Sequence, residues 1–305
     1  MKTLLVLLSI CLSPLVFAEA KLTIDITQGV DNPTQIAVVP FRIKRGVDLV
    51  DDVAAIMDGD LLRSGQFAPI TRNNMLSLPN KVRDVFFRDW RAINAEYVVV
   101  GSISSAVGGN IELSVSLVDV ARQQEVLNRK IIGQKTRIRA LAHAASDAIY
   151  EQITGIKGAF SGRILYVSSD KLEDGFIYRL HMADTDGYNE RIIIESSEPV
   201  LSPAWSPDAK QIAYVSFEGR KPAIYRQVLA TQEREKLVDY PGLNGSPAWS
   251  PDGKHLAMVL SKDGNPDIYV MNLETKALKR VVRHFSIDTE PAWLPDGKSL
   301  LFTSD

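Results

Sequence analysis

The 305-residue sequence contains a single cysteine, Cys11, so no disulfide bond can form within the chain. A protein without disulfides must take its stability from a hydrophobic core. The hydrophobic content of 45% is typical of a soluble globular chain, and the length allows two domains. We therefore expect two ordinarily packed domains rather than a small disulfide-rich scaffold.

An excess of charge of one sign is also lacking. The chain has 35 basic and 37 acidic residues, which gives a formal net charge of −2. Proteins that bind nucleic acid or anionic membranes through long-range electrostatics usually carry a clear positive excess. The composition therefore argues against nucleic acid and against a membrane surface as partners.

Catalytic and metal-binding signatures are absent from the sequence. Gly158–Gly162 has its serine one place too late for a Gly-x-Ser-x-Gly elbow. No phosphate-binding glycine loop and no His-Glu-x-x-His motif occur. Asp184–Gly187 has its glycine at the fourth place instead of the sixth of a calcium loop, so we interpret it as a hairpin turn. We expect no enzymatic activity, no cofactor and no metal, and structural roles for the four histidines, which are His143, His181, His255 and His284.

The only long apolar run is too short to span a bilayer. Lys2 provides a basic start, Leu4–Leu12 is apolar, and Pro14 ends the run. Small residues then precede a cleavage site between Ala18 and Glu19, as in a secretory signal peptide. We predict that residues 1–18 are removed on export and that the chain has no direct membrane span.

The tryptophans mark an internal repeat. Trp205, Trp249 and Trp293 are each 44 residues apart, in the stretches SPAWSPDA, SPAWSPDG and EPAWLPDG. A period in the 40s is typical of propeller blades or helical arrays. Turn residues follow each tryptophan, and then come short apolar runs with strand character and no helical period. Four short strands per repeat predict an all-β propeller.

A partial copy precedes the three full ones. Arg163–Ser168 matches Gln211–Ser216, but no Pro-Ala-Trp stretch comes before it. We expect the propeller to begin at the second strand of a blade, with the missing first strand supplied by the far end of the chain. Residues 159–305 are therefore predicted to hold an incomplete propeller of about three blades, in an amino-terminal fragment of a longer protein.

Residues 19–158 alternate between strand and helix patterns, which predicts a small α/β domain. The second helix is expected to turn Val85, Phe86, Trp90 and Ile93 inward. A linker is expected at residues 154–160. The predicted strands are 21–27, 36–41 and 97–104 with a hairpin at 111–120 and 125–132, and the predicted helices are 47–62, 82–95 and 138–153.

Recognition is expected where the repeats differ. The tryptophans occupy the same position in every copy, so we expect them to pack between neighbouring blades. The loops before the inner strands vary while their flanks repeat, and such positions are free to carry recognition. These loops are Glu198–Leu201, Gly242–Gly245 and Ile287–Glu290, and we place them at the mouth of the propeller channel.

The order of these parts resembles the TolB family, the periplasmic components of the Tol–Pal envelope system of Gram-negative bacteria. The blade motif alone is shared with other propellers, but the two domains in this order are more specific. The family has six blades, which would need about 120 further residues. The matching segments are Gly29–Asp31, Val38–Phe41, Tyr97–Gly101, Ser146-Asp147, Thr154-Gly155, Lys157–Phe160 and Ser261–Met271.

The resemblance implies a periplasmic binding protein that supports outer-membrane constriction and integrity during cell division. Members hold the lipoprotein Pal over the channel mouth and engage the inner-membrane protein TolA through their mature amino terminus, and colicins and phage use them for import. The expected Pal-binding residues are Pro199, Leu243, Asn244, Ser246, Asp288, Thr289 and Glu290. The expected TolA-binding residues are Glu19, Ala20, Lys21, Leu22, Thr23, Ile24, Asp25 and Ile26.

Leu243 departs from some relatives, which carry a polar or charged residue there. An alternating strand at a free terminus, such as residues 21–27, could also add to another protein's sheet edge or pack on its own domain. A second class of function remains open, because prolyl-oligopeptidase-like peptidases also build propellers from this motif. That alternative requires a hydrolase domain beyond Asp305.

Overall fold

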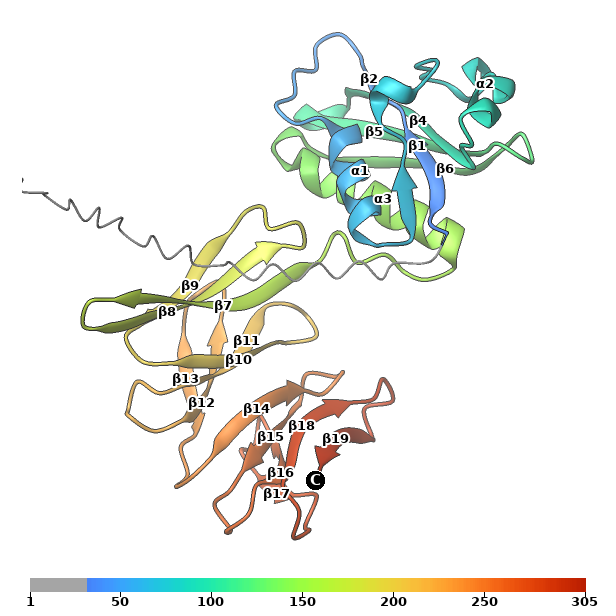
Figure 1. Cartoon of the computed structure of the whole chain (residues 1–305). Helices are drawn as coiled ribbons and strands as arrows, with labels where there is room; N and C mark the ends of the chain where they lie inside the picture. The colour runs from blue at the N-terminus through green and yellow to red at the C-terminus, as the bar shows by residue number, and fades with distance from the viewer. Residues whose placement is uncertain (1–31) are drawn as a thin grey trace, which may run out of the picture.

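The computed structural model describes residues 32–305, and it shows an amino-terminal α/β domain followed by β-propeller blades (Figure 1). We call the part that ends at Thr154 the N domain. The predicted signal peptide and the predicted strand at 21–27 lie outside the described residues. Among residues 32–305, no helix has both the length and the apolar character needed to cross a membrane.

The N domain is built on one mixed sheet with the strand order β3-β1-β4-β5-β6. Strand β1 runs parallel to both β3 and β4, whereas β5 runs antiparallel to its two neighbours, β4 and β6. The short β2 pairs with the end of β4. The strands are β1 (Thr34–Val38), β2 (Arg42–Ile43), β3 (Phe67–Pro69), β4 (Tyr97–Ser105), β5 (Asn110–Asp119) and β6 (Gln124–Gln134).

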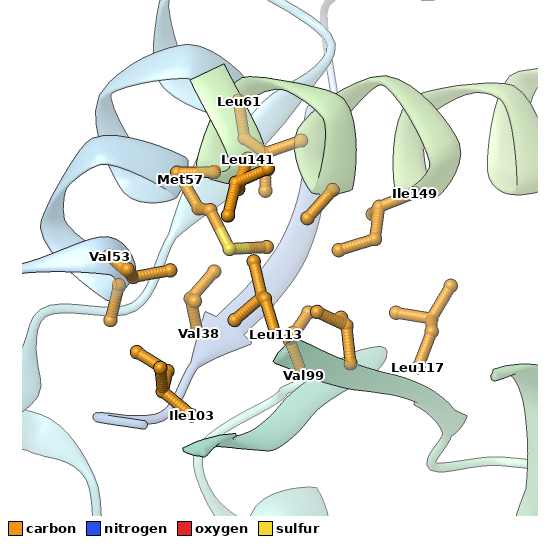
Figure 2. Packing of buried hydrophobic residues seen from close by; sticks show 14 of the residues in the cluster. Val38, Val53, Met57, Leu61, Val99, Ile103, Leu113, Leu117, Leu141 and Ile149 are labelled. Atoms are coloured by element: carbon orange, nitrogen blue, oxygen red, sulfur yellow. The ribbon is translucent and has the colours of Figure 1, made fainter. Parts of the chain in front are cut away.

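Helices cover both faces of this sheet. Helices α1 (Val53–Arg63) and α3 (Ile138–Thr154) pack on one face, where Met57 and Ile149 meet strand residues such as Leu113 (Figure 2). The segment around α2 (Phe87–Ala92) covers the other face, and Trp90 is buried there. Single 3-10 turns lie at Arg72–Asn74, Val82–Asp84, Val107–Gly109 and Lys135–Arg137.

Several predicted boundaries in the N domain are wrong. The helix predicted at 47–62 begins only at Val53, because the Asp52 carboxylate accepts hydrogen bonds from Ala54 N and Ala55 N and caps the helix there. The helix predicted at 82–95 shortens to α2, and Phe86 is exposed instead of facing inward. Strand β3 was not predicted. Strand β4, the β5–β6 hairpin and α3 are confirmed with small shifts in their bounds.

A close contact on the helical face joins two of the segments that carry the family resemblance. Gly101 lies in the central strand β4, between Val99 and Ile103, whose side chains point to the α1–α3 core. The Phe41 ring occupies the space beside Gly101, and a Cβ atom there would overlap both that ring and Ser114 O. The site therefore requires glycine for its lack of a side chain.

The propeller part contains two four-stranded blades, flanked by a three-stranded sheet before them and a two-stranded sheet after them. The first sheet begins at the position of a second blade strand, as predicted. We call the sheets blades 1 to 4 in chain order. Their strands are β7 (Arg163–Leu172), β8 (Gly175–Asp184), β9 (Arg191–Ser196), β10 (Val200–Trp205), β11 (Gln211–Ser216), β12 (Ala223–Val228), β13 (Arg234–Val238), β14 (Asn244–Trp249), β15 (His255–Leu260), β16 (Asp267–Asn272), β17 (Leu278–Arg280), β18 (Asp288–Trp293) and β19 (Leu300–Ser304).

The repeat tryptophans pack between blades, as predicted. Trp205 packs against a cluster that includes Leu180 of blade 1, and Trp249 packs against a cluster that includes Val215 of blade 2. The Trp293 indole N–H donates to Ala248 O of blade 3 at 3.1 Å. Each tryptophan therefore joins its own blade to the preceding one.

The turn after each tryptophan needs a residue with positive φ. Gly253 and Gly297 fill this position at φ 70° and 65°, but the first copy has Ala209 at φ 54°. Replacing Ala209 with glycine is expected to stabilise the protein by about 0.5–1 kcal/mol, because a left-handed conformation costs L-residues more than glycine loses in chain entropy. Urea unfolding would measure the difference.

The matched control is Gly253→Ala, because the added Cβ meets nothing closer than Pro207 Cδ at 3.8 Å. This variant is expected to lose a similar amount of stability. A stabilising Gly253→Ala change would contradict the backbone explanation.

Candidate partner-binding surface

The predicted Pal-binding residues lie around the starts of the inner strands. β14 lies next to both β10 and β18, so these three strands converge as the innermost strands of their blades. The loops that precede them, and the β15–β16 turn that contacts one of these loops, form one end of the propeller part. The structure therefore brings Pro199, Leu243 and Thr289 to one end, each at the entry to an inner strand.

Two of the predicted residues are fully buried. The Asn244 side chain donates to Tyr240 O at 2.7 Å and to Pro222 O at 3.1 Å, and it accepts from Tyr240 N at 3.1 Å. These bonds fold the loop that carries Leu243. Asp288 occupies the same repeat position and is also buried. Neither side chain reaches the surface, and Asn244 shapes its loop through these hydrogen bonds.

Leu243 is presented to solvent. The residue is 41% exposed, and its backbone N–H donates to Ser261 Oγ at 2.7 Å. The preceding Gly242 has φ 86°, and a Cβ on it would overlap the same hydroxyl. The loop therefore needs glycine at 242 to place Leu243 in this position.

Ser246 and Glu290 sit in bulges of the inner strands. The pairing of β14 with β15 and of β18 with β19 shifts at these residues, and both have positive φ. Ser202 is the equivalent residue in blade 2. A bulge bends its strand and re-aims the local side chains, so the same irregularity recurs on three neighbouring inner strands.

Further apolar side chains lie at this end that the sequence-based site prediction did not include. Ile287 is 47% exposed and begins the predicted loop Ile287–Glu290, one repeat length after Leu243, but it was not among the predicted Pal-binding residues. Phe285 is 88% exposed in the loop before β18. With Leu201 and Tyr240, which are also exposed, they define the apolar rim: Leu201, Tyr240, Leu243, Phe285 and Ile287.

A charged pair stiffens the turn beside the rim. The Tyr269 hydroxyl donates to Asp263 at 2.6 Å, and Lys262 lies 3.2 Å from the same carboxylate. Burial and this hydrogen bond raise the pKa of Tyr269 to about 12. The hydrogen bonds from Tyr269 and Lys262 hold the pKa of Asp263 below its ordinary value. The phenol therefore stays protonated and the carboxylate charged at neutral pH.

The predicted TolA-binding residues, Glu19 to Ile26, and the cleavage site at Ala18 and Glu19 lie outside the described residues. Between residues 32 and 305, no group of three or more acidic, histidine or cysteine side chains is arranged to hold a metal ion. Asp184–Gly187 forms a hairpin turn, as predicted, with Gly187 N donating to Asp184 O at 2.8 Å.

Comparison with known proteins gives consistent matches to both domains. A family profile described as the TolB amino-terminal domain matches residues 22–126, and one described as the TolB beta propeller domain matches residues 150–305. The Tol-Pal system protein TolB of Marinomonas sp. is 48% identical over 244 residues, which cover 78% of this chain and 56% of the relative. The protein of the same name from Pseudomonas fluorescens SBW25 is 47% identical over 237 residues, which cover 77% and 54%.

The crystal structure of TolB from Acinetobacter baumannii superposes with a TM-score of 0.79 at 43% sequence identity. The match covers 90% of this chain and 67% of that structure. The chain thus spans about half the length of the curated relatives it matches.

Proposed function

Because the chain belongs to the TolB family of the Tol-Pal system, we propose that it acts in the periplasm as a scaffold between Pal and TolA. In this role it links the inner membrane to outer-membrane constriction and integrity during cell division. The observation that carries the proposal is the apolar rim at the end of the propeller part where the inner strands begin.

The rim has the composition of a protein-binding surface. Interfaces are enriched in large apolar and aromatic side chains at their centres, and a few such residues carry most of the binding energy. Leu243, Phe285 and Ile287 supply this kind of surface, while buried Asn244 and the bonded Ser261 hold the loop in shape. A preformed loop loses little conformational entropy on binding. These features support Pal binding at the rim.

TolA binding is proposed for the mature amino terminus, residues 19–26, on the strength of the family resemblance and the alternating sequence. Leu22, Ile24 and Ile26 share one face of an extended chain. Such a segment can pair with a sheet edge of a partner through main-chain hydrogen bonds. The two partners would then bind at separate parts of the protein.

Deleting residues 19–26 from the full-length mature protein is expected to abolish binding to the soluble periplasmic part of TolA. Binding to the soluble part of Pal should stay within about twofold, because the rim is untouched. Isothermal titration calorimetry with each partner would measure both affinities. Loss of both interactions from a folded variant would contradict separate binding sites.

The alternative of a peptidase propeller is not supported. The domain that precedes the blades matches the TolB amino-terminal domain over residues 22–126, and the curated matches named above are Tol-Pal system proteins. The chain thus belongs to a family of scaffold proteins and not of enzymes.

A further inference from the structure

The contact between the N domain and blade 1 contains a buried cluster of charged side chains. Helix α3 of the N domain meets the turn between β8 and β9 of blade 1. Arg139 of α3 forms an ion pair with Asp186 of this turn, and its guanidinium carbon lies 4.0 Å from the centre of the Tyr188 ring. Arg139 also lies 3.5 Å from Asp51, in the segment before α1.

His143, one helical turn beyond Arg139, bridges the two domains. Its Nδ1 lies 2.8 Å from Asp60 Oδ2 on α1, and its Nε2 lies 3.5 Å from Asp186 Oδ2 on blade 1. The side chain of His143 is 3% exposed, and those of Asp60 and Asp186 are 0% and 6% exposed. The ring is thus placed between two buried carboxylates that belong to different domains.

The hydrogen-bonding capacity of the ring depends on its protonation. A carboxylate only accepts hydrogen bonds, whereas a neutral imidazole carries one N–H and one bare nitrogen. Only the imidazolium can direct an N–H toward both Asp60 and Asp186. When the ring loses a proton, one of its two nitrogens is left with a lone pair that faces a carboxylate oxygen, and this contact is repulsive.

The charges around the ring favour the same state. The titratable and charged groups that face the cluster are Asp60 and Arg63 on α1, Asp51 before α1, Arg139 on α3, and Asp186 in the β8–β9 turn. Three carboxylates and two guanidinium groups leave one negative charge. An imidazolium at His143 cancels it, and an uncompensated charge in a buried site is costly.

The linker between the domains is held by a second set of contacts. Asp147 of α3 accepts hydrogen bonds from Phe160 N at 2.7 Å and Ser161 N at 3.1 Å, and a Cβ on Gly158 would overlap Asp147. The Thr185 hydroxyl donates to Phe160 O at 2.7 Å. Because this set involves no histidine, a change at His143 would loosen the contact without separating the domains.

We propose that His143 is a proton-dependent latch between the N domain and blade 1. The latch is closed when the ring is charged, and it weakens as the pH rises and the ring loses a proton. Lowering the pH does not open the latch by protonating Asp186. Burial raises the pKa of the Asp186 carboxyl, but the hydrogen bonds from Tyr188 N and Arg139 outweigh burial and hold that pKa below its ordinary value.

Amide hydrogen exchange of the full-length mature protein, corrected for intrinsic rates, would test the latch between pH 5.5 and 8.5. Protection of residues 155–161 and 184–190 is expected to fall by about tenfold across this range, which corresponds to a loss of about 1.4 kcal/mol. His143→Gln should give weak protection at both pH values. Asp186→Asn should remove most of the pH dependence, because it takes away the carboxylate that faces Nε2. Its protection is expected to be weaker than in the wild type at both pH values, since the same carboxylate oxygen also pairs with Arg139.

His181→Gln is the matched control, since His181 pairs with Glu190 at 2.6 Å and with Ser168 at 2.8 Å, both within blade 1. This variant should still show the pH-dependent fall in exchange protection of the linker, residues 155–161. The proposal is overturned if wild-type protection does not change with pH, or if His143→Gln loses protection with pH as the wild type does. If His143→Gln does not fold, a pH-dependent fall that persists in Asp186→Asn overturns it equally.

Discussion

Replacing Leu243 with aspartate is expected to weaken Pal binding by at least about a hundredfold. Leu243 lies in the apolar rim, on a loop fixed by Ser261 and by buried Asn244. A carboxylate there would have to lose its water against an apolar partner surface without gaining a counter-charge, and such a change at the centre of an interface costs several kcal/mol. Titration calorimetry of full-length protein with soluble Pal would measure the loss.

The control for this change is Leu78→Asp. Leu78 is exposed to a comparable degree, but it lies in the N domain. It introduces the same charge and should leave the affinity for Pal unchanged. Normal binding by Leu243→Asp, or an equal loss in both variants, would mean that Pal does not dock on the rim.

Replacing Gly101 with alanine is expected to destabilise the N domain by about 3 kcal/mol or more. Most overpacked cores can shift side chains to make room, at about 1–3 kcal/mol. Here one of the overlapping atoms is Ser114 O, which belongs to the paired strand β5 and cannot move without breaking the ladder. The Phe41 ring closes the other side. Thermal or urea unfolding would show a separate, earlier transition for the N domain.

Gly219→Ala provides the comparison for this prediction. Gly219 lies in the β11–β12 turn without positive φ, and a Cβ there meets nothing within 4 Å. Its stability should change by less than about 0.5 kcal/mol. If Gly101→Ala were equally mild, the β4–β5 pairing would have to be more deformable than the packing indicates.

The repeated part of the fold was largely predictable from the sequence, because strands recognised in one repeat predict the strands at the same positions of the other repeats. The positions of Trp205, Trp249 and Trp293 predict the inner strands, and the absence of Pro-Ala-Trp before Arg163 predicts the three-stranded first blade. The extension of the β7–β8 hairpin beyond Ser168, in contrast, has no counterpart in the other copies and could not be inferred from them.

The N domain was less predictable, because its boundaries depend on single side chains. The periodic apolar pattern at 47–52 continues into α1, but Asp52 captures two N–H groups and starts the helix later. Val47 and Leu49 still pack on the core from a loop. The apolar pattern at 47–52 therefore predicted correctly that Val47 and Leu49 pack on the core, but it predicted a helix where the structure has a loop.

The candidate site shows the same limit. The variable loops were located from the sequence, but the roles of residues within them depend on which side chains fold inward. Asn244 and Leu243 are neighbours, and only the structure shows that one is bonded within the loop and the other is exposed. Ile287 lies in one of the predicted loops, whereas Phe285 lies before that loop and became apparent only through its exposure.

The joint between blades has a consequence for how the propeller can change its number of repeats. Pro207 lies against Gly253, and Pro251 lies against Gly297, in each case 3.8 Å from the position of a Cβ. Both contacts use the same two repeat positions: the proline of the turn in one copy packs against the glycine of the turn in the next copy. A duplicated 44-residue unit would carry both halves of this joint with it. Gain or loss of a whole blade therefore preserves the proline–glycine contact between neighbouring blades. An insertion that separates the proline from the glycine within one copy would disrupt the contacts with both neighbouring blades.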